Sequence, residues 1–284
     1  MQMDLIVFLS GNNLNAYTPL FLETLYRNCD VSNLHIHVVE KGRIVSDLIS
    51  TDRYGESFIE ENYVGGVGEN VHNYLLRKKE TSPVPFTIYE QHDPRPFFFQ
   101  AAPRVPLFNM IHDYSETLKW SMENCGTNRW AIFCHSDMFF LSDIITEFSN
   151  NLKDHMGMYG IWGHCLAINR EAYYKVGVGF ASISNFRAVR LPDSYKGWDY
   201  IIRHASDPRC LPDSKIIYGW DTFQLMELFM IANGWLCEVE DTHKLRYHVH
   251  HQASGHGYMN CQSAIDDIEN KINSALAKYG IQRV

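Results

Sequence analysis

The segment Arg129-Trp-Ala-Ile-Phe-Cys-His-Ser-Asp-Met-Phe-Phe140 carries an apolar run that ends in a polar His-Ser-Asp triplet. Residues 130–134 have the length and the β-prone, uniformly apolar character of a strand covered on both faces, as in a parallel sheet. Ligands of open α/β sheets bind beyond the carboxyl ends of such strands, where His135, Ser136 and Asp137 would lie. The triplet is therefore a candidate site. Because Asp and Ser are also common turn and helix N-cap residues, the alternative is that Asp137 only caps a turn.

The composition limits the classes of protein to which the chain can belong. The 284 residues are 45% hydrophobic and 20% charged, which is ordinary for a globular chain and unlike a disordered one. Their number fits one large α/β domain, with or without an appended element. The formal net charge of −8 argues against a general nucleic-acid binder, because basic patches supply most of the non-specific affinity for nucleic acids.

The cysteines and the apolar runs bear on location. The seven cysteines include no Cys-x-x-Cys pair, and we expect reduced thiols. The first ten residues are too short and lack the basic flank of a signal peptide, and no apolar run reaches the ~18 residues of a transmembrane candidate. The sequence predicts a cytoplasmic protein without a transmembrane segment, and it leaves peripheral membrane contact open.

Strands and helices alternate along most of the chain. In the first half, the pattern predicts strands over 5–9, 34–39 and 85–89 and helices over 16–27, 70–79 and 106–124. The first strand, helix and second strand form a βαβ unit, so these two strands should be parallel with a right-handed crossover. The loop after the first strand would then lie at the same sheet edge as Asp137.

The second half contains the central strand and a long irregular region. After residues 130–134, the pattern predicts helices over 143–152, 170–176, 219–235 and 263–280, a strand or strand pair over 157–169, and a strand over 236–240. Ser142 or Asp143 is the expected N-cap of the first of these helices. Asp221 falls in the first turn of the 219–235 helix, where the macrodipole alone favours a carboxylate. Residues 177–213 are polar and irregular, as expected of a lid or an acceptor loop.

Histidines gather near the end of this pattern, in Tyr247-His-Val-His-His-Gln-Ala-Ser-Gly-His256. On a strand, His248 and His250 would point the same way and His251 the other way. Imidazole suits zinc, manganese and other divalent metals. A hydrolytic zinc site is one reading, although no His-Glu-x-x-His helix is present to supply a general base.

Taken in order, these motifs resemble the inverting, family-two-like glycosyltransferases of the GT-A fold, over roughly residues 1–256. Five segments carry the resemblance. They are the Ser10-Gly-Asn-Asn13 loop, Ile132–Asp137 for the strand ending in Asp-x-Asp, Gly163–Gly177 for the segment beneath the donor sugar, Trp220–Leu225 with Asn233–Trp235 for the Glu-Asp-Thr helix, and Val249–Ser254 for the terminal His…Ser stretch. Two positions depart from the family pattern: His135 replaces its first Asp, and Trp220 replaces its Glu.

The resemblance implies an α/β fold of the GT-A type, the Rossmann-like fold of nucleotide-diphospho-sugar transferases. Its central sheet is mixed and mostly parallel, and helices flank it. A single domain would span 1–262, with a nucleotide-binding half over about 1–140 and an acceptor half over about 141–262. Residues 263–284 would form a C-terminal helix packed on that domain.

The resemblance also implies a reaction. A sugar would pass from a nucleotide-diphosphate donor to an acceptor hydroxyl with inversion, and the acceptor, a glycan, a lipid-linked chain or a protein, stays undefined. Asp221 would be the general base, and a divalent metal, Mn²⁺ before Mg²⁺, would bind Asp137, His250 and His248. The donor contacts expected at the sheet edge are Ser10, Asn12, Glu40, Asp93, His135 and Ser136.

Other readings remain open. A retaining transferase of the same fold would not need Asp221 as base. A non-catalytic module that binds a sugar nucleotide or a glycan is conceivable because His135 alters the triplet. The third alternative is the zinc hydrolase built on the terminal histidines, whereas a nucleotidyltransferase is disfavoured because no Gly-rich, basic loop follows the first strand.

Overall fold

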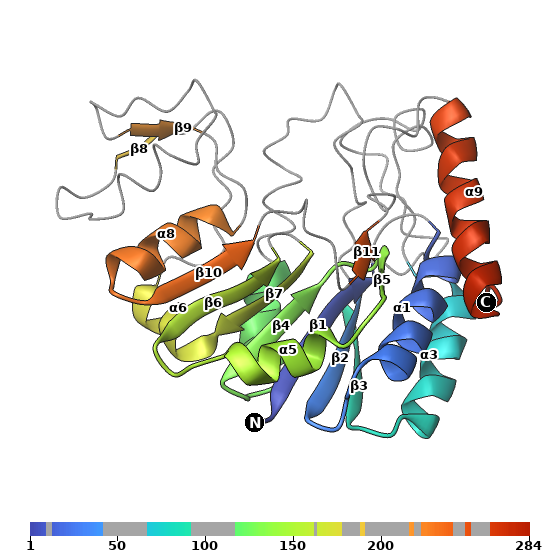
Figure 1. Cartoon of the computed structure of the whole chain (residues 1–284), viewed down its shortest axis with the longest axis horizontal. Coiled ribbons are helices and arrows are strands. Elements are labelled where there is room, and N and C mark those ends of the chain that lie inside the picture. Colours follow the sequence, from blue (N-terminus) through green and yellow to red (C-terminus); the bar gives the residue numbers. More distant parts are fainter. Residues whose placement is uncertain are drawn as a thin grey trace.

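The chain is built around a seven-stranded sheet with the strand order β10-β6-β7-β4-β1-β2-β3 (Figure 1). The computed structural model describes residues 1–9, 13–41, 67–91, 117–161, 164–177, 188–190, 216–218, 223–240, 248–250 and 262–284. The strands of the sheet are β1 (Met3–Leu9), β2 (Leu34–Lys41), β3 (Phe86–Gln91), β4 (Trp130–Cys134), β6 (Met156–Ile161), β7 (Cys165–Asn169) and β10 (Leu236–Glu240). Only β7 runs antiparallel to its neighbours in this sheet, which are β4 and β6. The predicted fold class, α/β with a mixed, mostly parallel sheet, is confirmed.

Helices cover both faces of the sheet. One face packs against α1 (Leu14–Asn28), α3 (Glu69–Thr81) and α5 (Ile144–Asn151). The other packs against α6 (Arg170–Val176), α8 (Gln224–Ala232) and the helical residues 117–124. Strand β1 is buried along its whole length, because alternate side chains enter the two hydrophobic clusters. This explains its continuously apolar sequence.

The C-terminal helix α9 (Gln262–Tyr279) lies on α1. Ile272 is fully buried there together with Tyr17 and Leu20 of α1. Arg27 donates a hydrogen bond of 2.5 Å to the carbonyl of Tyr279. The helix predicted over 263–280 is therefore present, and it packs on α1. In the part of the chain that the structure describes, no helix combines the length and apolar character needed to cross a membrane.

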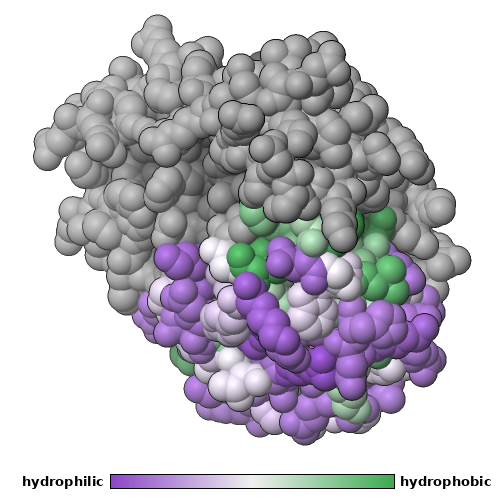
Figure 2. Space-filling model, turned by 90° about the vertical axis from the view of Figure 1, so that its left-hand side faces the viewer, coloured by the Kyte–Doolittle hydropathy of each residue, from purple (hydrophilic) through white to green (hydrophobic). Residues whose placement is uncertain are grey.

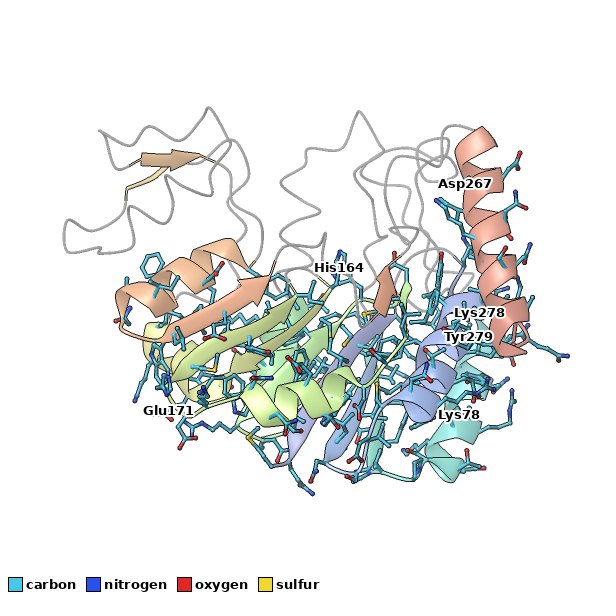
Figure 3. All side chains as sticks on the ribbon, in the orientation of Figure 1. Lys78, His164, Glu171, Asp267, Lys278 and Tyr279 are labelled. Atoms are coloured by element: carbon cyan, nitrogen blue, oxygen red, sulfur yellow. The ribbon has the colours of Figure 1, made fainter. Side chains whose placement is uncertain are left out.

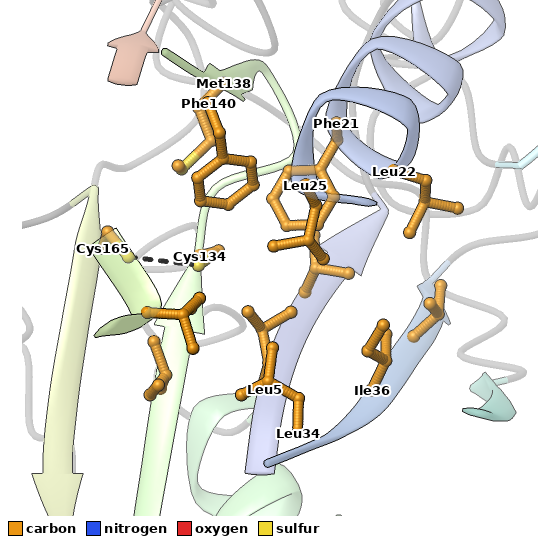
Figure 4. Close-up of a cluster of buried hydrophobic side chains, with 14 of the residues drawn as sticks. Leu5, Phe21, Leu22, Leu25, Leu34, Ile36, Cys134, Met138, Phe140 and Cys165 are labelled. Carbon is orange, nitrogen blue, oxygen red and sulfur yellow. Dashed lines mark hydrogen bonds between the residues drawn. The ribbon is translucent and has the colours of Figure 1, made fainter. Parts of the chain in front are cut away.

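The core around β4 contains a pair of facing thiols. Figure 4 shows Cys134 of β4 opposite Cys165 of β7, with their Sγ atoms 3.4 Å apart. Burial, followed by the Cys134 thiol beside it, raises the pKa of Cys165 well above its ordinary value. The five cysteines that the structure describes are free, as predicted, whereas Cys210 and Cys261 lie outside the described residues.

Most predicted elements occur with small shifts of their ends. Residues 130–134 and 170–176 match β4 and α6, and Asp143 caps α5 by accepting a 2.9 Å hydrogen bond from Thr146 N. The segment 157–169 is a pair of strands, β6 and β7.

Two predictions need correction. Residues 177–213 are not irregular throughout, since β8 (Ala188–Arg190) pairs antiparallel with β9 (Ile216–Tyr218). The 219–235 helix is shorter than predicted: α8 begins at Gln224, and its acidic first-turn residue is Glu227. Asp221 therefore precedes α8 and lies outside the described residues. The buried apolar side chains of this helix, Met226 and Met230, follow Gln224.

A buried polar network surrounds Asp4 at the amino ends of the parallel strands. Its carboxylate accepts hydrogen bonds from Asn128 N at 2.9 Å and Asn128 Nδ2 at 2.7 Å. His37 Nε2 lies 3.2 Å from Oδ1, and an Arg170 nitrogen lies 3.2 Å from Oδ2. Burial alone would raise the pKa of Asp4, but the hydrogen bonds and charges of these partners outweigh it and hold that pKa below its usual value. The network joins β1, β2, the turn before β4 and α6.

Figure 2 shows the described surface on one side of the molecule. Hydrophilic side chains cover most of it, and the hydrophobic ones gather along its upper border. The lower part of this side is therefore a solvated surface.

Gly126 lies against the side chain of Asp4. Its φ is +76°, and a Cβ there would lie 2.3 Å from the carboxyl carbon of Asp4. We expect Gly126→Ala to lower the free energy of unfolding by the ~1–2 kcal/mol cost of a left-handed Ala and by a further amount from displacing Asp4. Urea unfolding measures this. Gly177→Ala is the matched control, because Gly177 has a φ of +66° and no atom within 4 Å of its added Cβ. Equal losses for both variants would contradict the steric part.

Candidate functional site

The carboxyl ends of β1, β2, β3 and β4 share one edge of the sheet because these strands are parallel. His135, Ser136 and Asp137 follow β4 there, as predicted from the sequence. Ser136 and Asp137 are 4% and 1% exposed, whereas the His135 side chain is 32% exposed. His135 Nδ1 lies 4.0 Å from Asp137 Oδ1. The triplet thus offers one accessible imidazole beside a buried carboxylate.

His164 reaches the same edge from the opposite chain direction. It directly precedes β7, which runs antiparallel to β4. The backbone N–H of His135 donates to the carbonyl of His164 at 3.1 Å, and the two rings are 5.9 Å apart. Figure 3 shows His164 at the sheet edge, away from Glu171 at the other end. Sequence reasoning did not single out His164. Its signal was the apolar strand that follows it, but the reversed direction of that strand was not predicted.

A short two-stranded sheet brings the terminal histidines to Asp137. Strand β5 (Met138–Phe140) pairs antiparallel with β11 (His248–His250). His250 stands opposite Met138, the residue directly after Asp137, and His248 stands opposite Phe140. The structure therefore brings together, at the level of the backbone, the three residues predicted to bind metal, although they are more than a hundred positions apart in the sequence. The structure describes only the backbone of His248 and His250, not their side chains.

Helix α1 contributes Tyr17 to the surroundings of Asp137. Burial raises the pKa of Tyr17, and the negative charge of Asp137 raises it further. Tyr17 is fully buried and packs with Phe139 of β5 and with Ile272 of α9. A buried carboxylate costs free energy unless hydrogen bonds or a cation compensate for it. The burial of Asp137 therefore needs such compensation.

Of the six predicted donor contacts, the structure describes three: Glu40, His135 and Ser136. Glu40 is 1% exposed, and its two carboxylate oxygens lie 3.0 and 2.8 Å from His72 Nδ1 of α3. On the other side of the ring, His72 Nε2 is 3.9 Å from Glu90 Oε1 at the end of β3. Ser10, Asn12 and Asp93, together with the predicted base Asp221, lie outside the described residues.

Two groups of described side chains bring three metal-binding atoms within 4.8 Å of one another: Asp4 with His35 and His37, and Glu40 with His72 and Glu90. The first group belongs to the network at the amino end of the sheet. There His37 uses Nε2 toward Asp4 and Nδ1 toward the hydroxyl of Tyr89 at 3.1 Å. Because protein partners occupy both ring nitrogens of His37, this group is structural.

No family model matches the sequence, and no curated protein is similar to it in sequence. Solved structures that are similar include a mannosyltransferase from Pyrobaculum calidifontis in complex with GDP-Man and Mn²⁺, at 12% identity and a TM-score of 0.43, covering 98% of this chain and 73% of that one. Mouse xyloside xylosyltransferase 1 matches at 10% identity and a TM-score of 0.35, and the match covers 62% of this chain and 69% of that one.

The glycosyltransferase GlyE of Streptococcus pneumoniae TIGR4 matches at 10% identity and a TM-score of 0.33, covering 84% of this chain and 45% of that one. This chain thus spans less than half of GlyE. All three similar structures are glycosyltransferases, at identities of 10–12% and TM-scores of 0.33–0.43.

Proposed function

We propose that this chain is a metal-assisted glycosyltransferase that moves a sugar from a nucleotide-diphosphate donor to an acceptor hydroxyl with inversion. One observation carries the proposal: the pairing of β11 with β5 puts the strand of His248 and His250 beside the residue that follows Asp137. This pairing supports a common site for a carboxylate and imidazoles at the carboxyl edge of the sheet, where ligands of such folds bind.

The residues at this edge fit a divalent cation. Asp137 offers carboxylate oxygens and His250 and His248 offer imidazole nitrogens, a mixed set that Mn²⁺ accepts. When bound, such a cation would supply Lewis-acid neutralisation of charge on the departing nucleoside diphosphate. His135 and Ser136 would contact the donor, as would Ser10, Asn12 and Asp93. The geometry supports Glu40 less than His135 and Ser136, because both of its oxygens face His72.

The proposed reaction is a single displacement at the anomeric carbon. Asp221 would accept the proton of the acceptor hydroxyl as its oxygen attacks, and the bond to the diphosphate oxygen would break on the opposite face. A single domain over 1–262 would divide into a nucleotide-binding half, about 1–140, and an acceptor half, about 141–262. Residues 263–284 would form a C-terminal helix packed on that domain.

Replacing the proposed base tests the mechanism. We expect Asp221→Asn to lower the transfer rate at least about a hundredfold, because general-base catalysis contributes typically 10²–10⁴-fold. Donor affinity should stay nearly constant, since the amide keeps the size of the carboxylate. Initial rates and donor titrations measure the two effects. Wild-type turnover in Asp221→Asn would remove this residue from the mechanism and would favour a retaining reaction.

The donor class can be found with a thermal-shift panel of UDP-, GDP-, CMP- and dTDP-sugars, each with and without Mn²⁺. A ligand that binds only the native state raises stability by RT ln(1 + [L]/Kd). The proposal predicts a metal-dependent shift with one nucleotide, followed by sugar transfer in the presence of an acceptor. A shift without turnover against any acceptor would favour a non-catalytic binding module. A shift with Zn²⁺ alone, and with no nucleotide, would favour the zinc hydrolase.

A further inference from the structure

We propose that His72 and Glu90 form a second divalent-metal site, separate from Asp137, with the buried carboxylate of Glu40 orienting the histidine. The three residues come from the carboxyl ends of β2 and β3 and from the first turns of α3. The ion chemistry that fits them best is that of Zn²⁺, which binds imidazole nitrogen and carboxylate oxygen.

Glu40 fixes which nitrogen of His72 can bind a metal. The Glu40 side chain is 0% exposed, and both of its oxygens lie within 3.0 Å of His72 Nδ1. Nδ1 must carry the proton to donate this hydrogen bond, so in the neutral ring Nε2 carries the lone pair. Metal-binding histidines commonly donate their other N–H to a carboxylate in this way, which fixes the tautomer and raises the basicity of the ligand.

The other ring nitrogen of His72 faces a second carboxylate. His72 Nε2 lies 3.9 Å from Glu90 Oε1. In a tetrahedral zinc site with bonds of about 2.0–2.2 Å, two ligand atoms lie about 3.4 Å apart. Glu90 is 39% exposed and can close this difference by rotating, whereas the His72 side chain is 12% exposed and held by Glu40. Water would fill the remaining coordination positions.

The charges of the group favour a cation. One imidazole lies between two carboxylates, and one of these is fully buried. A divalent metal on Nε2 would place positive charge on the ring side of Glu40, which compensates for its burial.

The site is distinct from the proposed Asp137 centre. Strand β1 lies between β4, which precedes Asp137, and β2, which carries Glu40. Strands of a sheet are spaced about 4.8 Å apart, so the strands that lead to the two sites are about 10 Å apart. Zinc binding at His72 and Glu90 can therefore be tested whether or not the chain transfers a sugar at the Asp137 site.

Zinc titration of the full chain tests the proposal. Asp137→Asn serves as the reference protein, because it removes the carboxylate of the other proposed site. We expect calorimetry to show Zn²⁺ binding to the chelator-treated reference, and the affinity to fall at least tenfold when Glu90→Gln or His72→Gln is added. Glu40→Gln should weaken binding about 10–100-fold, as loss of an orienting carboxylate does. Glu80→Gln, an exposed carboxylate of α3, is the matched control and should leave the affinity unchanged.

Three results would overturn the proposal: no Zn²⁺ binding by the reference, an affinity that Glu90→Gln leaves unchanged, or an equal loss in Glu80→Gln. The first would mean that this group does not bind zinc. The second would assign the bound zinc to other histidines. Circular dichroism identifies any variant that fails to fold, and Glu90→Gln, which changes a partly exposed side chain, then decides the outcome.

Discussion

Asp4→Ala should lower the free energy of unfolding by about 3–5 kcal/mol, the cost of removing one partner from a buried ion pair. The Asp4 side chain is 0% exposed, and that of Arg170 is 8% exposed. Without the carboxylate, the Arg170 guanidinium and the donors of Asn128 lose an acceptor in the core. Arg170 cannot turn to solvent easily, because it also donates to the carbonyls of Asn128, at 2.9 Å, and Cys125, at 2.5 Å. Urea unfolding followed by circular dichroism measures the loss.

Asp154→Ala provides the matched comparison, because it removes the same side chain from an exposed pair. Asp154 Oδ1 lies 2.6 Å from Arg129, and the Asp154 side chain is 90% exposed. Exposed ion pairs contribute about 0–1 kcal/mol. A loss below 1 kcal/mol in both variants would show that the Asp4 network does not hold the amino end of the sheet together.

The wild type and Asp4→Ala should differ in how their stability responds to acid. Since the native pKa of Asp4 is lower than usual, the unfolded state binds a proton first as the pH falls. The stability that ionised Asp4 contributes is fully present above the unfolded-state pKa of about 3.9, and it is lost as the pH falls through the lower native value. The difference between wild type and Asp4→Ala should therefore shrink below pH ~4. A difference that grows in acid would reverse the sign of this linkage.

Asp137→Asn should reduce sugar transfer about a thousandfold if the proposed function is right. Charge stabilisation by a catalytic metal is worth several kcal/mol, and each 1.36 kcal/mol is a factor of about ten in rate. The amide keeps the shape of the buried side chain but removes its negative charge, so the metal-dependent shift in melting temperature with donor should also disappear. Initial rates over a range of Mn²⁺ concentrations measure the effect, and excess metal should restore part of the activity.

Asp143→Asn is the control for this substitution. Asp143 lies six positions further along, where it caps α5 through Thr146, and Asn is about as good an N-cap as Asp. Its activity and stability should match those of the wild type. Full metal-dependent turnover in Asp137→Asn would remove Asp137 from the metal site.

Local patterns predicted much of the fold. Strand β4 and helix α6 were predicted with their observed ends, because an apolar run buried on both faces and a short helix between Asn169 and Gly177 are encoded by neighbouring residues. The placement of His135, Ser136 and Asp137 at the sheet edge followed from the same reasoning. The βαβ start was also predicted correctly, since a short crossover admits one hand.

Non-local pairing accounts for what the sequence did not predict. The reversed direction of β7, and with it the position of His164, depends on β4, more than thirty residues earlier. The approach of His250 to Met138 spans more than a hundred residues. His72 looked like any polar position on an amphipathic helix, because its partner Glu40 lies on a separate strand. Periodicity reports which face of an element is buried, but it does not identify the partner.

The Asp4 network also constrains the order in which the chain folds. Asp4 is made 124 residues before Asn128 and 166 residues before Arg170, which donate to its carboxylate from later in the chain. Until then, the Asp4 carboxylate has His37 of β2 as a partner but lacks Asn128 and Arg170, and burial of a charge without its full set of partners is costly. The βαβ unit of β1, α1 and β2 is therefore expected to gain its full stability only after Arg170 has been made.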